Sequence, residues 1–133
     1  MTKKIITKSS KFLVDEAKKQ ISNISANEAL KLHNDKNYLF IDLRDIRELQ
    51  STGKIKEAKH VPRGMLEFWI DPESPYHKDF FSKNYNFIFY CASGWRSALS
   101  TLTVQKMGLK NVSHIEGGFT HWLEINGPIE KLE

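Results

Sequence analysis

The sequence predicts an α/β fold with a mainly parallel central sheet of about five strands and helices on both faces. Short apolar runs of strand length alternate along the chain with stretches of helical period. The clearest runs, Tyr38–Asp42 and Asn86–Tyr90, are apolar at nearly every position, which is typical of parallel strands covered on both sides. The chain has 133 residues, the size of one domain with one core. We therefore expect a single domain over residues 1–133, with an N-terminal extension and helix over residues 1–19 and a core over about residues 20–126.

Local patterns place the elements along this chain. The first helix is amphipathic and begins at about Ser10, and the second opens at Ser25–Glu28, where the Ser-x-x-Glu spacing is a capping box. Gly108 is well placed to end a later helix in the left-handed conformation. The other expected helices cover residues 45–50, 64–71, 76–81, 97–107 and 119–125, and the expected strands cover residues 20–24, 38–42, 58–61, 86–90 and 112–115.

Composition and charge exclude several classes of function. Twenty Lys and Arg against sixteen Asp and Glu give a net charge of +4, which is too diffuse along the chain for a nucleic-acid-binding surface. The single cysteine rules out an intrachain disulfide and a zinc cluster of thiolates. The first residues lack an apolar core of signal-peptide length, and no run approaches the roughly 18 apolar residues of a membrane span. We therefore expect a cytoplasmic protein with neither a nucleic acid nor a membrane as partner.

The most informative position is Cys91, at the end of a strand and just before a helix. In open α/β sheets ligands bind beyond the carboxyl ends of the strands, so this is a site position. The following segment contains Gly94, which permits a left-handed backbone, and it can curl its backbone N–H groups around the sulfur. These donors, the helix N-terminus and the guanidinium of Arg96 favour a thiolate, which is the nucleophilic form of cysteine. A lone cysteine is more often a small buried hydrophobe, but this setting favours a reactive one.

Four segments together resemble the rhodanese family. Residues 91–97 look like its active-site loop, in which the segment from Cys to Arg is six residues long. Ile41–Arg44 is similar to its Asp-x-Arg element after an early strand, and His60–Pro62 to its His-Val-Pro element. Glu116–Gly118, with Trp122 after it, is similar to its closing Gly-Gly motif. The loop residues expected at the active site are Cys91, Ala92, Ser93, Gly94, Trp95, Arg96 and Ser97.

The resemblance implies a thiosulfate sulfurtransferase. In this chemistry Cys91 takes a sulfane sulfur from a donor such as thiosulfate, carries it as a persulfide and passes it to cyanide or a thiol. The resemblance also implies that no metal or organic cofactor is needed. Arg96 would pair with the anionic donor and Trp95 would shape access at the rim of the loop. A protein that accepts the sulfur is a further candidate partner.

Several other polar and aromatic residues have weaker claims on the site. Asp42 and Arg44 follow a strand, and charged residues there commonly brace neighbouring loops by ion pairs, so we expect them to support the site. His60 is more often a structural residue in such a setting, and the reaction does not require a base. Arg63 and Trp69 line the pocket entrance in one interpretation and cover the core in the other. Trp122 is expected to pack in the core.

Two other functions fit part of the same pattern. Related folds use Cys-x5-Arg loops as phosphatases or arsenate reductases, but Arg96 is the fifth residue after Cys91, so this loop is one residue too short. A binding module, or a carrier that hands persulfide sulfur to one partner protein without turnover, would keep the same fold. Retention of Cys91 and Arg96 disfavours an inert module and leaves the carrier open.

Overall fold

A central five-stranded sheet organises the chain, and all of its neighbouring strands run parallel. The computed structural model describes residues 5–132, so residues 1–4 of the expected N-terminal extension lie outside it. The strand order is β1-β6-β5-β2-β4, which places β5 in the middle. The strands are β1 (Ser22–Ile24), β2 (Tyr38–Asp42), β4 (Lys59–His60), β5 (Asn86–Tyr90) and β6 (Val112–Ile115).

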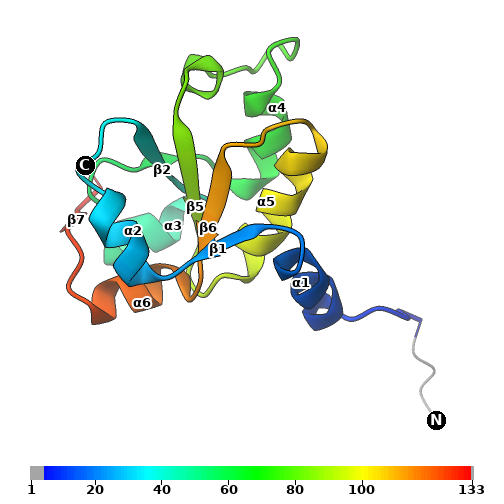
Figure 1. Ribbon diagram of the computed structural model, residues 1–133, viewed down its shortest axis with the longest axis horizontal. Helices are drawn as coiled ribbons and strands as arrows, with labels where there is room; N and C mark the ends of the chain where they lie inside the picture. Colours follow the sequence, from blue (N-terminus) through cyan, green and yellow to red (C-terminus); the bar gives the residue numbers. More distant parts are fainter. Residues whose placement is uncertain (1–4, 133) are drawn as a thin grey trace.

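Helices cover both faces of this sheet, as predicted (Figure 1). Successive side chains of β5 point to opposite faces, so Ile88 packs with one hydrophobic cluster and Phe87 with the other. The first cluster includes residues of α2 and α6, and the second includes residues of α4 and α5. The helices are α1 (Ser10–Lys18), α2 (Ala26–Leu32), α3 (Ile46–Thr52), α4 (Leu66–Ile70), α5 (Trp95–Lys106) and α6 (Gly118–Glu124).

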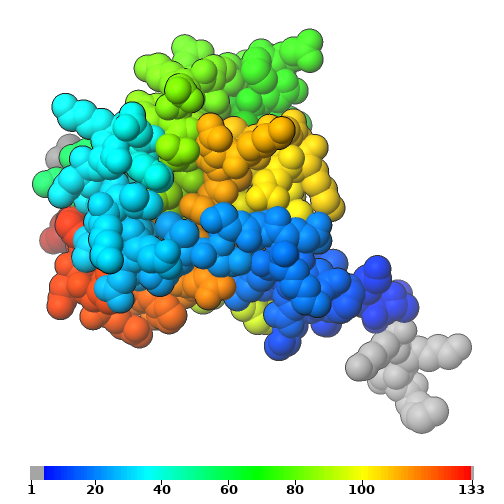
Figure 2. All heavy atoms as spheres, in the orientation of Figure 1, coloured from blue at the N-terminus to red at the C-terminus, as the bar shows by residue number. Residues whose placement is uncertain are grey.

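The first helix, α1, lies against α5 at one side of the molecule (Figures 1 and 2). Val14 and Ala17 on α1 are buried against Ala98 on α5, and these three form a small third cluster. Ser9 caps the helix by accepting a hydrogen bond from the backbone N–H of Phe12. Within residues 5–132, none of the helices combines the length and the apolarity that crossing a bilayer requires.

A small antiparallel pair near the C-terminus was not predicted. It joins β3 (Lys54–Ile55) to β7 (Ile129–Glu130), and Lys54 Nζ pairs with Glu130 Oε1 at 2.8 Å. Strands of two residues carry too little periodicity to be recognised in a sequence, and this pairing joins segments 76 residues apart. The ordered structure therefore continues past residue 126, where we expected the core to end.

The helix expected over residues 76–81 is wrong. Residues 72–76 form turns and a bend, and the only helix in this region is a 3₁₀ helix over Asp79–Ser82. The hydroxyl of Ser74 accepts a hydrogen bond from the backbone N–H of Tyr76 at 3.1 Å, and the His77 ring bonds the carbonyl of Trp69 at 3.0 Å. Such side-chain bonds satisfy the backbone locally and compete with a helix.

Ser100 on α5 provides a test of the packing. Its Oγ is buried and has no hydrogen-bond partner among the residues that the structure describes. We expect Ser100→Ala to raise the free energy of unfolding by about 1 kcal/mol, because it removes an unpaired polar atom and favours the helix. Urea denaturation measures this change. Ser97→Ala on the same helix should lower stability, since the Ser97 hydroxyl is hydrogen-bonded; a loss of stability in Ser100→Ala would contradict the prediction.

Candidate active site

The loop after β5 wraps the sulfur of Cys91. The backbone N–H groups of Gly94 and Ser97 point at Cys91 Sγ, with nitrogen–sulfur distances of 3.2 and 3.4 Å. Gly94 has φ +100°, the left-handed backbone that the sequence predicted, and this turn starts α5 directly over the cysteine. The positive end of the α5 dipole therefore lies at the sulfur, where it favours negative charge. Cys91 itself is 1% exposed, whereas Ser93 and Trp95 on the loop are exposed.

The N-terminus of α6 holds the other side of the same loop. The backbone N–H of Phe119 donates to the carbonyl of Cys91 at 2.8 Å, and that of Thr120 donates to the carbonyl of Ala92 at 3.1 Å. The Thr120 hydroxyl donates to the Ala92 carbonyl as well, at 3.0 Å. Gly118 permits this contact, because a Cβ there would collide with the Cys91 carbonyl oxygen. The closing Gly-Gly motif thus positions the cysteine loop.

Arg96 does not stand free beside the sulfur. Its guanidinium donates two hydrogen bonds to the carboxylate of Glu48 on α3, at 2.8 and 3.0 Å. The Glu48 carboxylate raises the pKa of Arg96, and the nearby Cys91 acts in the same direction. In return the guanidinium of Arg96 lowers the pKa of Glu48. Both side chains are about one third exposed, so solvent screens the pair. Sequence reasoning missed Glu48, whose only signal was its place in the capping box of α3.

Asp42 and Arg44 form a buried ion pair, 0% and 2% exposed. Arg44 Nη2 lies 2.7 Å from Asp42 Oδ2, and the guanidinium also donates to the Thr52 hydroxyl and the Gly53 carbonyl, at 2.9 and 2.8 Å. Burial opposes the charge of Arg44, but the hydrogen bond and charge of Asp42, with smaller effects of Tyr90 and Glu48, together raise the pKa of Arg44. The guanidinium packs 4.2 Å from the ring centroid of Phe119. The pair therefore ties the end of β2 to α3 and to the start of α6.

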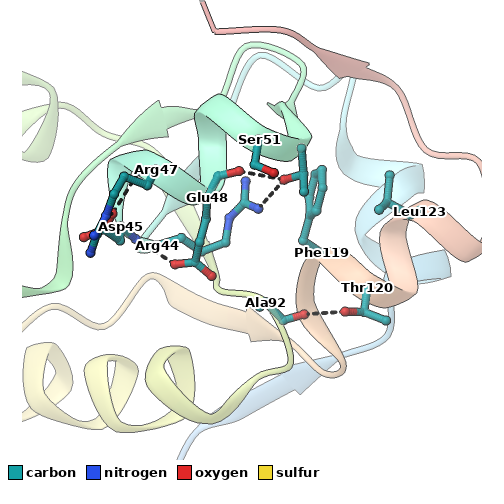
Figure 3. A pocket seen from close by; sticks show the side chains of 10 residues that line it. Arg44, Asp45, Arg47, Glu48, Ser51, Ala92, Phe119, Thr120 and Leu123 are labelled. Carbon is teal, nitrogen blue, oxygen red and sulfur yellow. Dashed lines mark hydrogen bonds and ion pairs between the residues drawn. The ribbon is translucent and has the colours of Figure 1, made fainter.

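A pocket of about 550 Å³ opens beside the loop, between α3 and α6 (Figure 3). Ala92 of the cysteine loop lies at its edge, and its walls are charged on the α3 side and largely apolar on the α6 side. Its lining residues are Arg44, Asp45, Arg47, Glu48, Ser51, Thr52, Ala92, Phe119, Thr120 and Leu123.

The remaining sequence candidates lie outside this pocket lining. His60 Nε2 bonds the Arg44 carbonyl at 2.7 Å, and Arg63 starts the 3₁₀ turn before α4. Trp69 packs against the α4–α5 cluster, with Lys78 Nζ 4.8 Å from its ring centroid. Trp122 is fully buried, which confirms its predicted place in the core. Within residues 5–132, no group of three His, Cys, Asp or Glu is arranged to hold a metal ion.

Comparison with known proteins agrees with this geometry. Residues 25–125 match the family model described as rhodanese-like domain. The chain belongs to the rhodanese-like family. A solved structure from Rhodopseudomonas palustris, a protein of unknown function described as a possible tyrosine phosphatase, is 46% identical to this rhodanese-like chain. It covers 98% of this chain and 100% of its own, with a TM-score of 0.93.

Two further relatives carry names that refer to activities. The polysulfide-sulfur transferase homodimer of Wolinella succinogenes is 31% identical, with a TM-score of 0.68, over 90% of this chain and 85% of its own. A tRNA uridine(34) hydroxylase of Prochlorococcus marinus is 30% identical over 115 residues. That match covers 84% of the rhodanese-like chain but only 36% of the hydroxylase. Sulfurtransferases are thus among the homologues, while the hydroxylase is matched over about a third of its length.

Removal of Arg44 tests the buried pair in this rhodanese-like domain. Arg44→Met should lower the free energy of unfolding by about 3–5 kcal/mol, because it leaves the buried Asp42 carboxylate without its counter-charge. Urea denaturation measures the loss. The matched control is Arg47→Met, which removes an ion pair of similar length to Asp45 on the surface and should leave the unfolding midpoint unchanged. Equal midpoints for the two variants would refute the bracing role.

His114 on β6 gives a pH-dependent test. Burial, with a smaller effect of Lys18, lowers the pKa of His114 from 6.5 to about 4. Between these values the unfolded chain binds a proton that the folded chain does not, so His114 makes stability fall as the pH falls. We expect the free energy of unfolding of the parent, relative to that of His114→Gln, to fall by about 3 kcal/mol as the pH is lowered from 6.5 to about 4. Urea unfolding of both proteins at several pH values checks it, and parallel curves would contradict it.

Proposed function

We propose that this rhodanese-like chain is a sulfurtransferase that carries sulfane sulfur as a persulfide on Cys91. The observation that carries the proposal is the pair of backbone N–H groups aimed at Cys91 Sγ, from Gly94 and Ser97. Two such donors and a helix N-terminus stabilise an anionic sulfur without a metal or an organic cofactor. The sulfurtransferase among the solved relatives supports the same class of reaction.

The proposed cycle has two displacement steps. The Cys91 thiolate attacks the outer sulfur of a donor such as thiosulfate, the sulfur–sulfur bond of the donor breaks, and its electron pair leaves with sulfite. Cys91 then carries a persulfide. A nucleophilic acceptor, cyanide or a thiolate, attacks the terminal sulfur and returns the bonding electron pair to Cys91 as a thiolate. Neither step needs a general base, and the Nε2 atom of His60 is bonded to the Arg44 carbonyl.

The charged groups around the loop suit an anionic donor. Arg96 is the cation of the loop, and its guanidinium is bonded to Glu48. In this proposal a donor anion binds the same guanidinium, which then contacts both the donor and Glu48. We propose that the pocket between α3 and α6 receives the part of the donor or acceptor that does not react, because it borders Ala92. Trp95 is 45% exposed at the loop and shapes the approach. A protein acceptor in the cytoplasm belongs to the same proposal, and so does a carrier that releases sulfur quickly only to that acceptor.

A phosphatase is the second candidate, because the 46% identical relative is described as a possible tyrosine phosphatase. The loop argues against it here. Arg96 is the fifth residue after Cys91, and two of the six loop backbone positions after Cys91 already point their N–H groups at the sulfur itself. The cradle therefore fits one sulfur atom better than a tetrahedral phosphate group. Hydrolysis of an aryl phosphate at a rate comparable to sulfur transfer would favour the phosphatase.

Intact mass measurement tests the proposed function directly. Incubation with thiosulfate should add the mass of one sulfur atom to the chain, because Cys91 is its only cysteine, and cyanide should remove it. Cys91→Ser should gain nothing. Ser100→Ala, whose hydroxyl lies in the same helix without a hydrogen-bond partner in the described residues, should load sulfur like the parent. Loading that persists in Cys91→Ser would show that the nucleophile is wrong.

A further inference from the structure

Four side chains, from two strands, one helix and the loop after β5, form a continuous chain of contacts that ends at the sulfur. Cys91 Sγ lies 3.6 Å from Ser97 Oγ, which lies 2.9 Å from His114 Nδ1. The other ring nitrogen, His114 Nε2, lies 2.7 Å from Asn23 Oδ1 on β1. Cys91, Ser97 and His114 are buried. The sulfur-transfer cycle proposed above uses the backbone N–H of Ser97 but none of the side chains of Ser97, His114 and Asn23.

The contacts of Asn23 determine which nitrogen of His114 carries the proton. Asn23 Nδ2 donates to the carbonyls of Lys18 and Ile21, at 2.8 and 3.2 Å, so the amide nitrogen must face these two acceptors. The amide oxygen then faces His114 Nε2 and can only accept. His114 Nε2 is therefore protonated.

His114 is neutral at physiological pH, so its second nitrogen has no proton. Burial lowers the pKa of the ring to about 4, and Lys18 on the adjacent α1 acts in the same direction. The other polar or titratable groups in the chain of contacts are Asn23 from β1, Ser97 from α5 and Cys91 after β5. None of them is a carboxylate that would hold an imidazolium. His114 Nδ1 is therefore an acceptor, and the Ser97 hydroxyl must donate its proton to it.

The hydrogen bond from the Ser97 hydroxyl to His114 affects the protonation of Cys91. With its only proton given to His114, the Ser97 hydroxyl presents a lone pair to the sulfur, and the thiol proton of Cys91 is donated to it. A thiolate would either face that lone pair or turn the hydroxyl away and leave a buried ring nitrogen without a donor. Either alternative costs free energy and so favours the thiol, whereas the N–H groups of Gly94 and Ser97 favour the thiolate.

We propose that His114 and Asn23 are positioning residues that hold the Ser97 hydroxyl as an acceptor toward Cys91, so that the resting sulfur keeps its proton. This inference rests on the proposed function, because it concerns the nucleophile of the sulfur-transfer cycle. The backbone N–H groups of the loop favour the thiolate of Cys91. The chain of contacts through the side chains of Ser97, His114 and Asn23, called here the side-chain relay, favours the protonated thiol. The reactivity of Cys91 is therefore set by the balance between the two.

The direction of the relay is measured first by NMR of the full chain labelled with ¹⁵N in histidine. At neutral pH the expected spectrum of His114 has a proton on Nε2 and none on Nδ1, with its assignment taken from the missing signals of His114→Gln. A proton on Nδ1, or a fully protonated ring, would overturn the proposal. The measurement requires neither a sulfur donor nor turnover.

The restraint itself is measured by the pH profile of alkylation of Cys91 with iodoacetamide. Ser97→Ala and His114→Phe should alkylate about tenfold faster than the parent below neutral pH, with profiles moved to lower pH by about one unit, because each removes the restraint and keeps the backbone donors. Ser100→Ala is the matched control, since it removes a buried hydroxyl from the same helix without touching the relay, and its profile should equal that of the parent.

Two outcomes of this experiment reject the proposal. Slower alkylation of Ser97→Ala would mean that the hydroxyl donates to the thiolate, and an unchanged profile would mean that the relay is structural only. Ser97→Ala and the NMR result decide the question even where His114→Phe does not fold. Because iodoacetamide needs no sulfane sulfur, these outcomes are independent of thiosulfate loading, whose failure would reject the proposed function instead.

Discussion

Two helix N-termini meet at the carboxyl end of the central strand, and the structure of the site depends on this meeting. The start of α5 directs its N–H groups to the sulfur of Cys91, while the start of α6 directs its N–H groups to the carbonyls of Cys91 and Ala92. One short segment thus satisfies donors from both helices. The carbonyls and the sulfur of the loop are therefore held by hydrogen bonds from opposite sides.

The buried pair of Asp42 and Arg44 secures this arrangement from the neighbouring strand. β2 lies next to β5 in the sheet, so Asp42 stands level with Tyr90, the residue before the cysteine. Arg44 reaches from there to the end of α3 and stacks on Phe119 at the start of α6. The same helix α3 supplies Glu48 to Arg96. Among the residues that the structure describes, the Asp42–Arg44 pair makes no hydrogen bond to the sulfur, but it holds α3 and α6, the two walls of the pocket beside the loop.

Much of the fold and the centre of the site could be predicted because their signals are local. Continuous apolar runs gave β2 and β5 their correct limits, and the Ser25 capping box marked the start of α2. The left-handed turn at Gly94 was predictable for the same reason. Contacts between distant segments were not, since Asn23 and His114 are 91 residues apart and a histidine within a strand has no distinctive pattern. The pairing of β3 with β7 was missed for the same reason, because it joins two-residue strands that are distant in the sequence.

The charge balance of the loop bears on what it can hold. Because Glu48 pairs with Arg96, the sulfur of Cys91 faces backbone dipoles and a guanidinium whose charge is partly neutralised. Dipoles of this kind suffice for a single anionic sulfur, whereas a phosphate dianion demands more positive charge and more donors. The relay through Ser97 and His114 adds no positive charge either, since His114 is neutral. A cradle of this modest strength suits the proposed cycle, in which a sulfur atom is accepted and then released, because a site that held the anion tightly would slow its transfer to the acceptor.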